Sequence, residues 1–381
     1  MAAPPVNGEM LLLARKRRRM TQKELAALSG VAQAAISRIE NGTKDTLRLE
    51  DVRSIAETLK FPVRFFYDQE PLFKYPLSLH GAAFRKKSSV PAKEQDAVVA
   101  LANHYVLHYR RLLDAIDFEA EYKLLQFELI SDKNCVSEHA EGVSSAAEAA
   151  SRVRASWHLD DKPLPNLAHY IEATGVIVIE GDFGEADIDG VTLRPTGMKP
   201  IILLNQNRPS DRKRFSLAHE YGHVVLHPYP VDSMEKEANQ FASELLMPKS
   251  GILPDLKYSL SIRRLGELKQ KWRVAMAALI YRAKALNVIP DTAASSLYKK
   301  MNMYGYRKRE PQEFDVPSDR GQVSDKLVQL HLTELGYSTE ELSSALRTDP
   351  VEFASMHGLS FPNLKLKPQR PKLRIVANNN K

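Results

Sequence analysis

Apolar residues recur every three or four positions along much of this 381-residue chain, which is the spacing of one face of an α-helix. Three short runs rich in Val, Ile and Leu, at residues 175–180, 188–193 and 201–204, predict β-strands instead. The pattern therefore predicts a mainly α fold with a small β-sheet (α+β). Helical spacing is found at residues 9–18, 22–28, 33–41, 49–60, 91–116, 142–157, 165–173, 262–271 and 273–286.

Residues 214–227 read RFSLAHEYGHVVLH and contain the pattern H-E-x-x-H. On a helix, this spacing places His219 and His223 one turn apart on the same face, where both imidazoles can reach one metal ion. The pair suits Zn²⁺. Glu220, beside the first histidine, is suited to take a proton from an attacking water, which is the general-base role of this motif in metallopeptidases.

A second helix is predicted at residues 233–248, where one face is apolar. Glu235 and Glu237 flank that face, and either carboxylate would complete a site of two histidines and one glutamate that leaves a fourth position open for water. Helical periodicity alone does not choose between them. His227 is a poorer candidate, because eight residues along a straight helix correspond to about 12 Å of rise from His219.

These two segments, RFSLAHEYGHVVLH and EKEANQFASELLMP, resemble the ImmA/IrrE family of zinc metallopeptidases, and the resemblance extends over about residues 163–289. It implies a zincin-like fold, a Zn²⁺ cofactor and a helix-turn-helix repressor as the substrate. In this family the glutamate directly before Ala-Asn is the third ligand. The resemblance therefore implies Glu220 as the catalytic residue and His219, His223 and Glu237 as the metal ligands.

One position departs from better-known zinc peptidases with a glutamate ligand. Four residues past Glu237 stands Phe241, where an aspartate would orient a ligand histidine. The sequence does not identify the side chain that takes over this role.

Composition indicates a soluble globular protein. Hydrophobic residues make up 43% and charged residues 27% of the chain, and no apolar run approaches the roughly 20 residues that span a membrane. The first residues do not read as a secretory signal. Cys135 is the only cysteine, so a disulfide within the chain and a cysteine-based zinc site are excluded, and we interpret it as a buried or incidental thiol. We expect a cytoplasmic protein.

The formal net charge is +7, and the excess gathers at the two ends of the chain. Residues 15–19 are all basic, and residues 362–381 carry several basic residues and no acid. Basic ends on a near-neutral middle indicate contact with a polyanion, nucleic acid first. We expect residues 362–381, rich in Pro and Asn, to be disordered.

The first 70 residues have the pattern of a helix-turn-helix. Residues 21–24 read as a capping box, residues 29–31 as a tight turn, and Gly42 closes the third helix. Small or apolar residues stand where the two central helices must wedge together. The stretch TQKELAALSGVAQAAISRIENGT resembles the XRE-type, phage-repressor-like family of helix-turn-helix domains, over about residues 8–68 and five helices.

In such domains the third helix lies in the major groove of double-stranded DNA, and flanking residues hold phosphate. The resemblance assigns base contacts to Gln33, Ala34, Ser37 and Arg38, and backbone contacts to Gln22, Lys23, Arg17 and Arg18. One departure is Ala32, where the family usually has a Ser or Thr cap. The missing cap costs about 1 kcal/mol of stability.

The sequence predicts five parts: a helix-turn-helix domain at 8–68, a linker and helical connector at 69–162, a zinc peptidase domain at 163–289, a helical region at 290–361 and a basic tail at 362–381. The pair His104 and His108 has helical i, i+4 spacing, but aromatic residues surround it and no Glu follows the first histidine. We interpret both as packing or surface residues. Residues 187–193 are a candidate edge strand that would hold an extended substrate, with an internal strand as the alternative.

Together these patterns predict a DNA-bound regulator that cleaves a partner repressor or antitoxin, or itself, and so relieves repression in a stress or mobile-element response. A homodimer is expected on a palindromic operator. The alternative is a transcription factor or antitoxin whose zincin domain senses a signal or dimerises without proteolysis.

Overall fold

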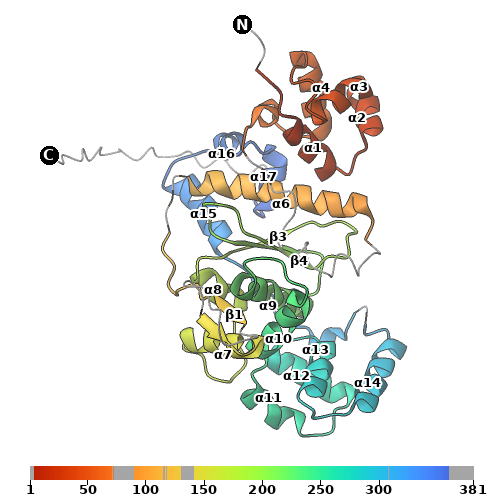
Figure 1. Ribbon diagram of the computed structural model, residues 1–381, viewed down its shortest axis with the longest axis vertical. Coiled ribbons are helices and arrows are strands. Elements are labelled where there is room, and N and C mark those ends of the chain that lie inside the picture. The colour runs from red at the N-terminus through yellow and green to blue at the C-terminus, as the bar shows by residue number, and fades with distance from the viewer. Residues whose placement is uncertain are drawn as a thin grey trace, which may run out of the picture. The chain divides into compact units, whose positions relative to one another are not determined.

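The computed structural model describes residues 4–70, 72, 90–114, 116, 118–129, 141–307 and 309–359 (Figure 1). The chain divides into two compact units, each built from separate stretches. Unit 1 comprises Met1–Leu72, Asp96–Asp117 and Val323–Lys381, and unit 2 comprises Phe73–Gln95 and Phe118–Gln322. Helices dominate and the described strands form two small sheets, so the predicted α+β class is confirmed. No helix in the described ranges is long and apolar enough to cross a bilayer.

Unit 1 begins with the five helices expected of the helix-turn-helix. Their bounds are α1 Gly8–Arg17, α2 Gln22–Ser29, α3 Gln33–Glu40, α4 Leu49–Leu59 and the 3₁₀ helix η1 Val63–Tyr67. Thr21 and Glu24 form the predicted capping box, and Gly30, with a φ of 71°, ends α2 in the left-handed conformation. Ala32 makes no side-chain cap at the start of α3, as predicted.

The core of these helices also includes Ala100 and Leu107 from α6 (Ala92–Leu113). Three helices from the far end of the sequence belong to the same unit: α15 (Val323–Thr333), α16 (Thr339–Ala345) and α17 (Pro350–Met356). Figure 1 shows them in blue beside the orange α6. Unit 1 is therefore a helix-turn-helix extended by helices from two later stretches of the chain.

Buried histidines fill the contact between α6 and the C-terminal helices. His108 Nε2 lies 2.9 Å from His357 Nε2, and His108 Nδ1 lies 3.2 Å from Thr348 Oγ1. Burial lowers the pKa of His104 and of His357 to about 4, although the carboxylate of Glu352 opposes this at His104. These rings are therefore neutral near pH 7, in agreement with the packing role predicted for His104 and His108.

Unit 2 contains a three-stranded sheet at the predicted positions, with β3 (Ile177–Gly181), β4 (Gly190–Leu193) and β5 (Ile201–Asn205) in the order β3-β5-β4. β3 runs parallel to β5, and β4 runs antiparallel to it. Within the described residues β4 pairs on one side only, which makes it an edge strand of this sheet. A second, two-stranded sheet joins β1 (Phe127–Leu129) to β2 (Glu141–Val143).

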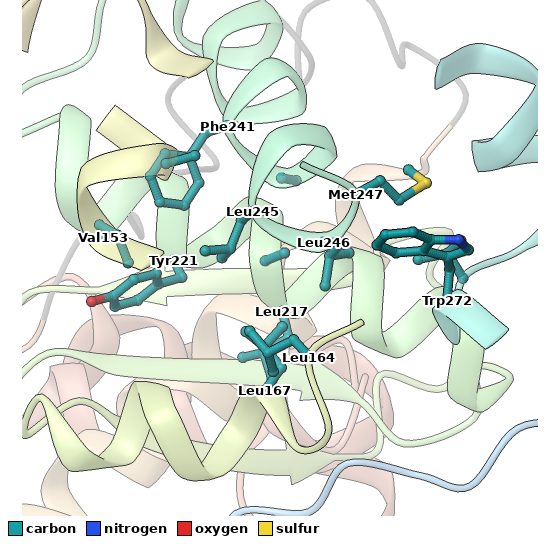
Figure 2. Packing of buried hydrophobic residues seen from close by; sticks show 14 of the residues in the cluster. Val153, Leu164, Leu167, Leu217, Tyr221, Phe241, Leu245, Leu246, Met247 and Trp272 are labelled. Carbon is teal, nitrogen blue, oxygen red and sulfur yellow. The ribbon is translucent and has the colours of Figure 1, made fainter. Parts of the chain in front are cut away.

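The long helix α9 (Ser210–Leu226) packs on β4 and β5, and α10 (Met234–Leu246) packs against both α9 and α7 (Ala146–Ser156). Buried side chains from these helices pack together, as Figure 2 shows for Tyr221 of α9 near Phe241 and Leu245 of α10. The unit also contains α8 (Leu167–Ala173), α11 (Lys249–Leu256), α12 (Ile262–Trp272), α13 (Met276–Ala285), α14 (Asp291–Met303) and the 3₁₀ helix η3 (Gln312–Phe314).

These units group the chain differently from the five predicted parts. Residues 96–117 of the expected connector join the helix-turn-helix, and the region expected at 290–361 is divided between the two units. The division follows burial, because α6 and α17 contribute to the interior of unit 1. Most of the linker expected at 71–91, Cys135 and the basic tail lie outside the described residues.

Candidate metal centre and DNA-reading helix

Gly222, inside the HEYGH motif, allows α9 and α10 to lie close together. A Cβ atom at this position would lie 3.1 Å from Phe241 Cδ1 and 3.3 Å from Ala238 Cα, which is tighter than ordinary packing. Phe241 itself is fully buried against α9. The small residue in the motif therefore brings the polar residues of α10 near the two histidines of α9.

His219, His223 and Glu235 bring three ligand atoms to one point. The two histidine Nε2 atoms are 3.1 Å apart, Glu235 Oε2 is 3.4 Å from His219 Nε2, and Glu235 Oε1 is 3.5 Å from His223 Nε2. A tetrahedral Zn²⁺ site with bonds of about 2.0–2.1 Å has neighbouring donors about 3.3 Å apart, so this donor set fits the ion. In the part of the chain that the structure describes, no other group of His, Cys, Asp and Glu side chains meets in this way.

The carboxylate that meets the two histidines belongs to Glu235, not to Glu237, which the family resemblance had implied as the third ligand. Glu237 Oε2 lies 2.8 Å from His227 Nε2 instead. Side chains that stand two residues apart on an α-helix point in directions about 200° apart, so the carboxylates of Glu235 and Glu237 cannot both face the same point. The geometry thus favours Glu235, the alternative that helical periodicity had left open, over the ligand implied by the resemblance.

Asn239 is the side chain that orients His219. Its Oδ1 atom lies 3.1 Å from His219 Nδ1. Asn239 stands four residues after Glu235, whereas counting four residues from Glu237 had led to Phe241. An Nδ1–H that donates to this oxygen leaves Nε2 unprotonated and free to bind a metal.

Glu220 is held beside the imidazoles by strand β4. Only 5% of Glu220 is exposed, and Thr192 Oγ1 lies 2.7 Å from its Oε2 atom and 3.0 Å from its backbone oxygen. Gly190 leaves room for the glutamate, because a Cβ atom there would lie 3.1 Å from Glu220 Cγ. Sequence reasoning did not single out Thr192 or Gly190, since neither belongs to the motif.

The pKa shifts at the centre have a common origin. Burial lowers the pKa of His219, but its hydrogen bond to Glu235 and the charge of Glu220 raise it by more, so the net shift is upward. Burial raises the pKa of Glu235, but hydrogen bonds to His219 and His223 bring it well below its ordinary value. Both shifts reflect the short distances that also make the three side chains suitable as ligands.

A pocket of about 560 Å³ opens beside the centre and shares Asn239 with it. Phe215, Ala278, Tyr281 and Tyr306 give it an apolar and aromatic lining. The polar part of the lining includes a buried ion-pair cluster, in which Lys269 Nζ lies 2.6 Å from Asp211 Oδ2 and 2.8 Å from Glu310 Oε2.

On the helix-turn-helix, α3 carries Gln33, Ala34 and Arg38 on its exposed surface, and Ser37 is half-buried. Gln33 Nε2 donates to Gln22 Oε1 at 3.0 Å, and Gln22 Nε2 donates to Glu40 Oε2 at 2.8 Å. This chain of hydrogen bonds ties the start of α2 to α3. Lys23 is exposed at the start of α2.

Arg17 and Arg18 differ from expectation. Both bind Glu352 of α17, with Arg18 Nη2 2.5 Å and Arg17 Nη2 3.2 Å from its carboxylate oxygens. Arg18 also donates to the backbone oxygens of Leu59 and Lys60. Only 15% of the Arg17 side chain and 21% of the Arg18 side chain are exposed. The phosphate contacts expected of these two arginines would therefore have to compete with intramolecular partners.

Comparison with known families matches both parts of the chain. The helix-turn-helix family matches residues 11–66, and the peptidase M78 family, described as the IrrE N-terminal-like domain, matches residues 171–284. The chain carries an IrrE-like peptidase M78 domain behind a helix-turn-helix domain. The family resemblance inferred from sequence is thereby confirmed. The M78 domain is of the metallopeptidase type and contains β3–β5, α9 and α10, and the helix-turn-helix domain is of a DNA-binding type.

Two curated proteins of Bacillus subtilis (strain 168) are similar to a short part of the chain. The HTH-type transcriptional repressor RghR is 44% identical over 55 residues, which are 14% of this chain and 41% of RghR. The uncharacterized HTH-type transcriptional regulator RghRB is 38% identical over 55 residues, which are 14% of this chain and 40% of that protein. The chain thus spans about two fifths of the length of these curated relatives.

Proposed function

We propose that this protein is a DNA-binding regulator whose M78 domain is a zinc-dependent endopeptidase of the HExxH, gluzincin-like type. The observation that carries the proposal is the approach of two imidazoles and one carboxylate to a common point, with the buried Glu220 beside them. His219, His223 and Glu235 would hold Zn²⁺ through two nitrogens and one carboxylate, and the fourth position would remain open.

When bound, Zn²⁺ supplies the Lewis acid that polarises the scissile carbonyl and acidifies the attacking water. Glu220 takes the proton of that water on its carboxylate and then passes it to the leaving amine. Thr192 holds Glu220 in place through the hydrogen bond to Oε2. Asn239 keeps the Nδ1 proton of His219 away from the site, so that the Nε2 lone pair stays available.

The substrate we propose is an extended segment of another protein, a helix-turn-helix repressor or an antitoxin. An extended segment can add to the edge of β4 that has no neighbouring strand among the described residues, and β4 is the strand that holds Glu220. The pocket that shares Asn239 would then receive a side chain next to the scissile bond. The presence of a DNA-binding domain in the same chain favours a regulatory substrate, because it brings the peptidase to an operator where repressors are bound. We also propose that two copies bind a palindromic operator.

Metal removal tests the peptidase. Purified protein is loaded with one equivalent of zinc and incubated with helix-turn-helix proteins of the same genome and with a second copy of itself, and new amino termini are detected by mass spectrometry. We expect cleavage that disappears after dialysis against a chelator and returns when zinc is added. Zinc bound at one equivalent without cleavage of any of these proteins would favour a sensing or dimerising module instead.

The DNA-binding part gives a separate prediction. Arg38 is exposed on α3 and Lys23 is exposed at the start of α2. We expect Arg38→Ala to cost about 1–3 kcal/mol of operator binding and to relax the base preference at one position, since it reads bases. Lys23→Ala should weaken binding to all DNA sequences equally, since Lys23 is assigned to phosphate. It should also reduce the slope of binding affinity against salt concentration by about one released ion. Fluorescence anisotropy over a salt series distinguishes the two, and equal behaviour of both variants would contradict the assigned roles.

A further inference from the structure

His227 ends α9 in a position that connects two parts of the metal centre. His227 is the C-cap of the helix, and its backbone N–H donates to His223 O at 3.1 Å. Only 2% of His227 is exposed. Its ring Nδ1 lies 3.0 Å from His223 Nδ1, and its ring Nε2 lies 2.8 Å from Glu237 Oε2. Each ring nitrogen of His227 therefore has one partner, and these partners come from two helices.

The nitrogen atoms allow a single consistent arrangement of protons when His223 is a ligand. Its Nε2 atom points to His219 and Glu235, so that atom must present its lone pair and the ring proton must sit on Nδ1. The Nδ1 atoms of His223 and His227 are too close to carry a proton each. His227 Nδ1 is then the acceptor, and its own proton on Nε2 is donated to the Glu237 carboxylate.

We propose that His227 and Glu237 are positioning residues for the metal centre. They hold His223 in the tautomer that binds zinc, and the negative charge of the Glu237 carboxylate polarises His223 through the His227 ring that lies between them. This inference rests on the proposed function. It also gives Glu237 a role in place of the direct ligation implied by the family resemblance. A carboxylate behind a ligand histidine makes that ligand more basic and fixes its ring, and outer partners of this kind typically contribute 10–100-fold in metal affinity.

The two ligand histidines are thereby supported in different ways. His219 donates to the neutral amide oxygen of Asn239, whereas His223 donates to a ring that ends on a charged carboxylate. His223 is fully buried and the His219 side chain is 15% exposed. The stronger acceptor therefore stands behind the histidine that water does not reach.

The test compares zinc affinities, measured by competition with a chelator, for four variants of the full chain. His227→Leu removes both hydrogen bonds and should weaken zinc binding by about 10–100-fold. His227→Gln keeps an acceptor for His223 and a donor for Glu237, so it should bind zinc within about threefold of the wild type. Glu237→Gln keeps the acceptor but loses the charge and should weaken binding by about tenfold. Lys236→Gln, one residue away and exposed, is the matched control and should bind as the wild type does.

A purely structural role for His227 would give the opposite order, because Leu fills a buried site at a lower desolvation cost than Gln. The tautomers provide a second measurement, since ¹⁵N spectra of histidine-labelled, zinc-loaded protein should show His223 protonated on Nδ1 and His227 on Nε2. If His227→Leu does not fold, Glu237→Gln, whose side chain is 19% exposed, still tests the relay. Wild-type affinity in both His227→Leu and Glu237→Gln, or the reverse tautomers, would overturn the inference and leave the peptidase proposal standing. A wild type that binds no zinc would overturn both.

Discussion

Glu220→Gln should retain zinc and lose peptide-bond cleavage. Glutamine has nearly the shape of glutamate and still accepts the hydrogen bond from Thr192, so we expect the fold and the ligand geometry to be preserved. It cannot accept a proton from the attacking water. General acid–base catalysis typically contributes about 10²–10⁴-fold, and we expect a loss of kcat in this range. Single-turnover cleavage of the proposed repressor substrate and metal analysis of the same sample measure both quantities.

The control for this experiment is Thr192→Val, which keeps the carboxylate and removes only the hydroxyl that holds it. We expect a smaller loss of kcat than for Glu220→Gln, with zinc content unchanged. In cells, derepression of the target gene should fail in the Glu220→Gln strain. An unchanged cleavage rate in Glu220→Gln would remove Glu220 from the mechanism, and unchanged derepression would favour a module without physiological proteolysis.

The second large effect separates two glutamates that stand two residues apart. Glu235→Gln should lower the zinc content of purified protein far below one equivalent, because it removes one of the three proposed protein ligands. Glu237→Gln should still be purified with about one equivalent of zinc, because Glu237 contacts His227 and not the ligand atoms. We expect a loss in affinity of at least about 100-fold for the first variant and no more than about tenfold for the second. Metal analysis after dialysis against a weak chelator shows the difference.

Both variants replace a half-buried carboxylate in the first turn of α10, so they lose a similar favourable interaction with the helix N-terminus and serve as controls for each other. The opposite order, with zinc lost in Glu237→Gln and kept in Glu235→Gln, would restore the ligand set implied by the family resemblance.

Local signals in the sequence predicted most of the elements. The capping box at Thr21, the turn at Gly30 and the short β-branched runs lie where the structure has the start of α2, its end and the strands of unit 2. These signals act within a few residues, so a single sequence contains them in full. α11 was not predicted, because Pro254 stands inside it and Pro248 directly before it.

Helical periodicity could not decide whether Glu235 or Glu237 is the third ligand, because both flank the apolar face of α10. What decides it is the closeness of α9 and α10, which depends on Gly222 of one helix and Phe241 of the other. Thr192 reaches Glu220 from a strand 28 residues earlier, and Asn239 reaches His219 from a helix 20 residues later. Such contacts depend on the packing of elements that are distant in sequence, so rules of local residue spacing do not predict them.

Glu352 belongs to α17, whereas the two arginines that it binds lie at the end of α1, with Arg17 as its last residue and Arg18 as its C-cap. During translation, Arg17 and Arg18 leave the ribosome more than 300 residues before their carboxylate exists. A nascent chain that has already completed its peptidase segment therefore still presents two uncompensated guanidinium groups near its amino terminus. The helix-turn-helix therefore gains the carboxylate that compensates these two arginines only once residue 352 has been made, so a chain that stops before that residue presents a more positive surface to nucleic acid.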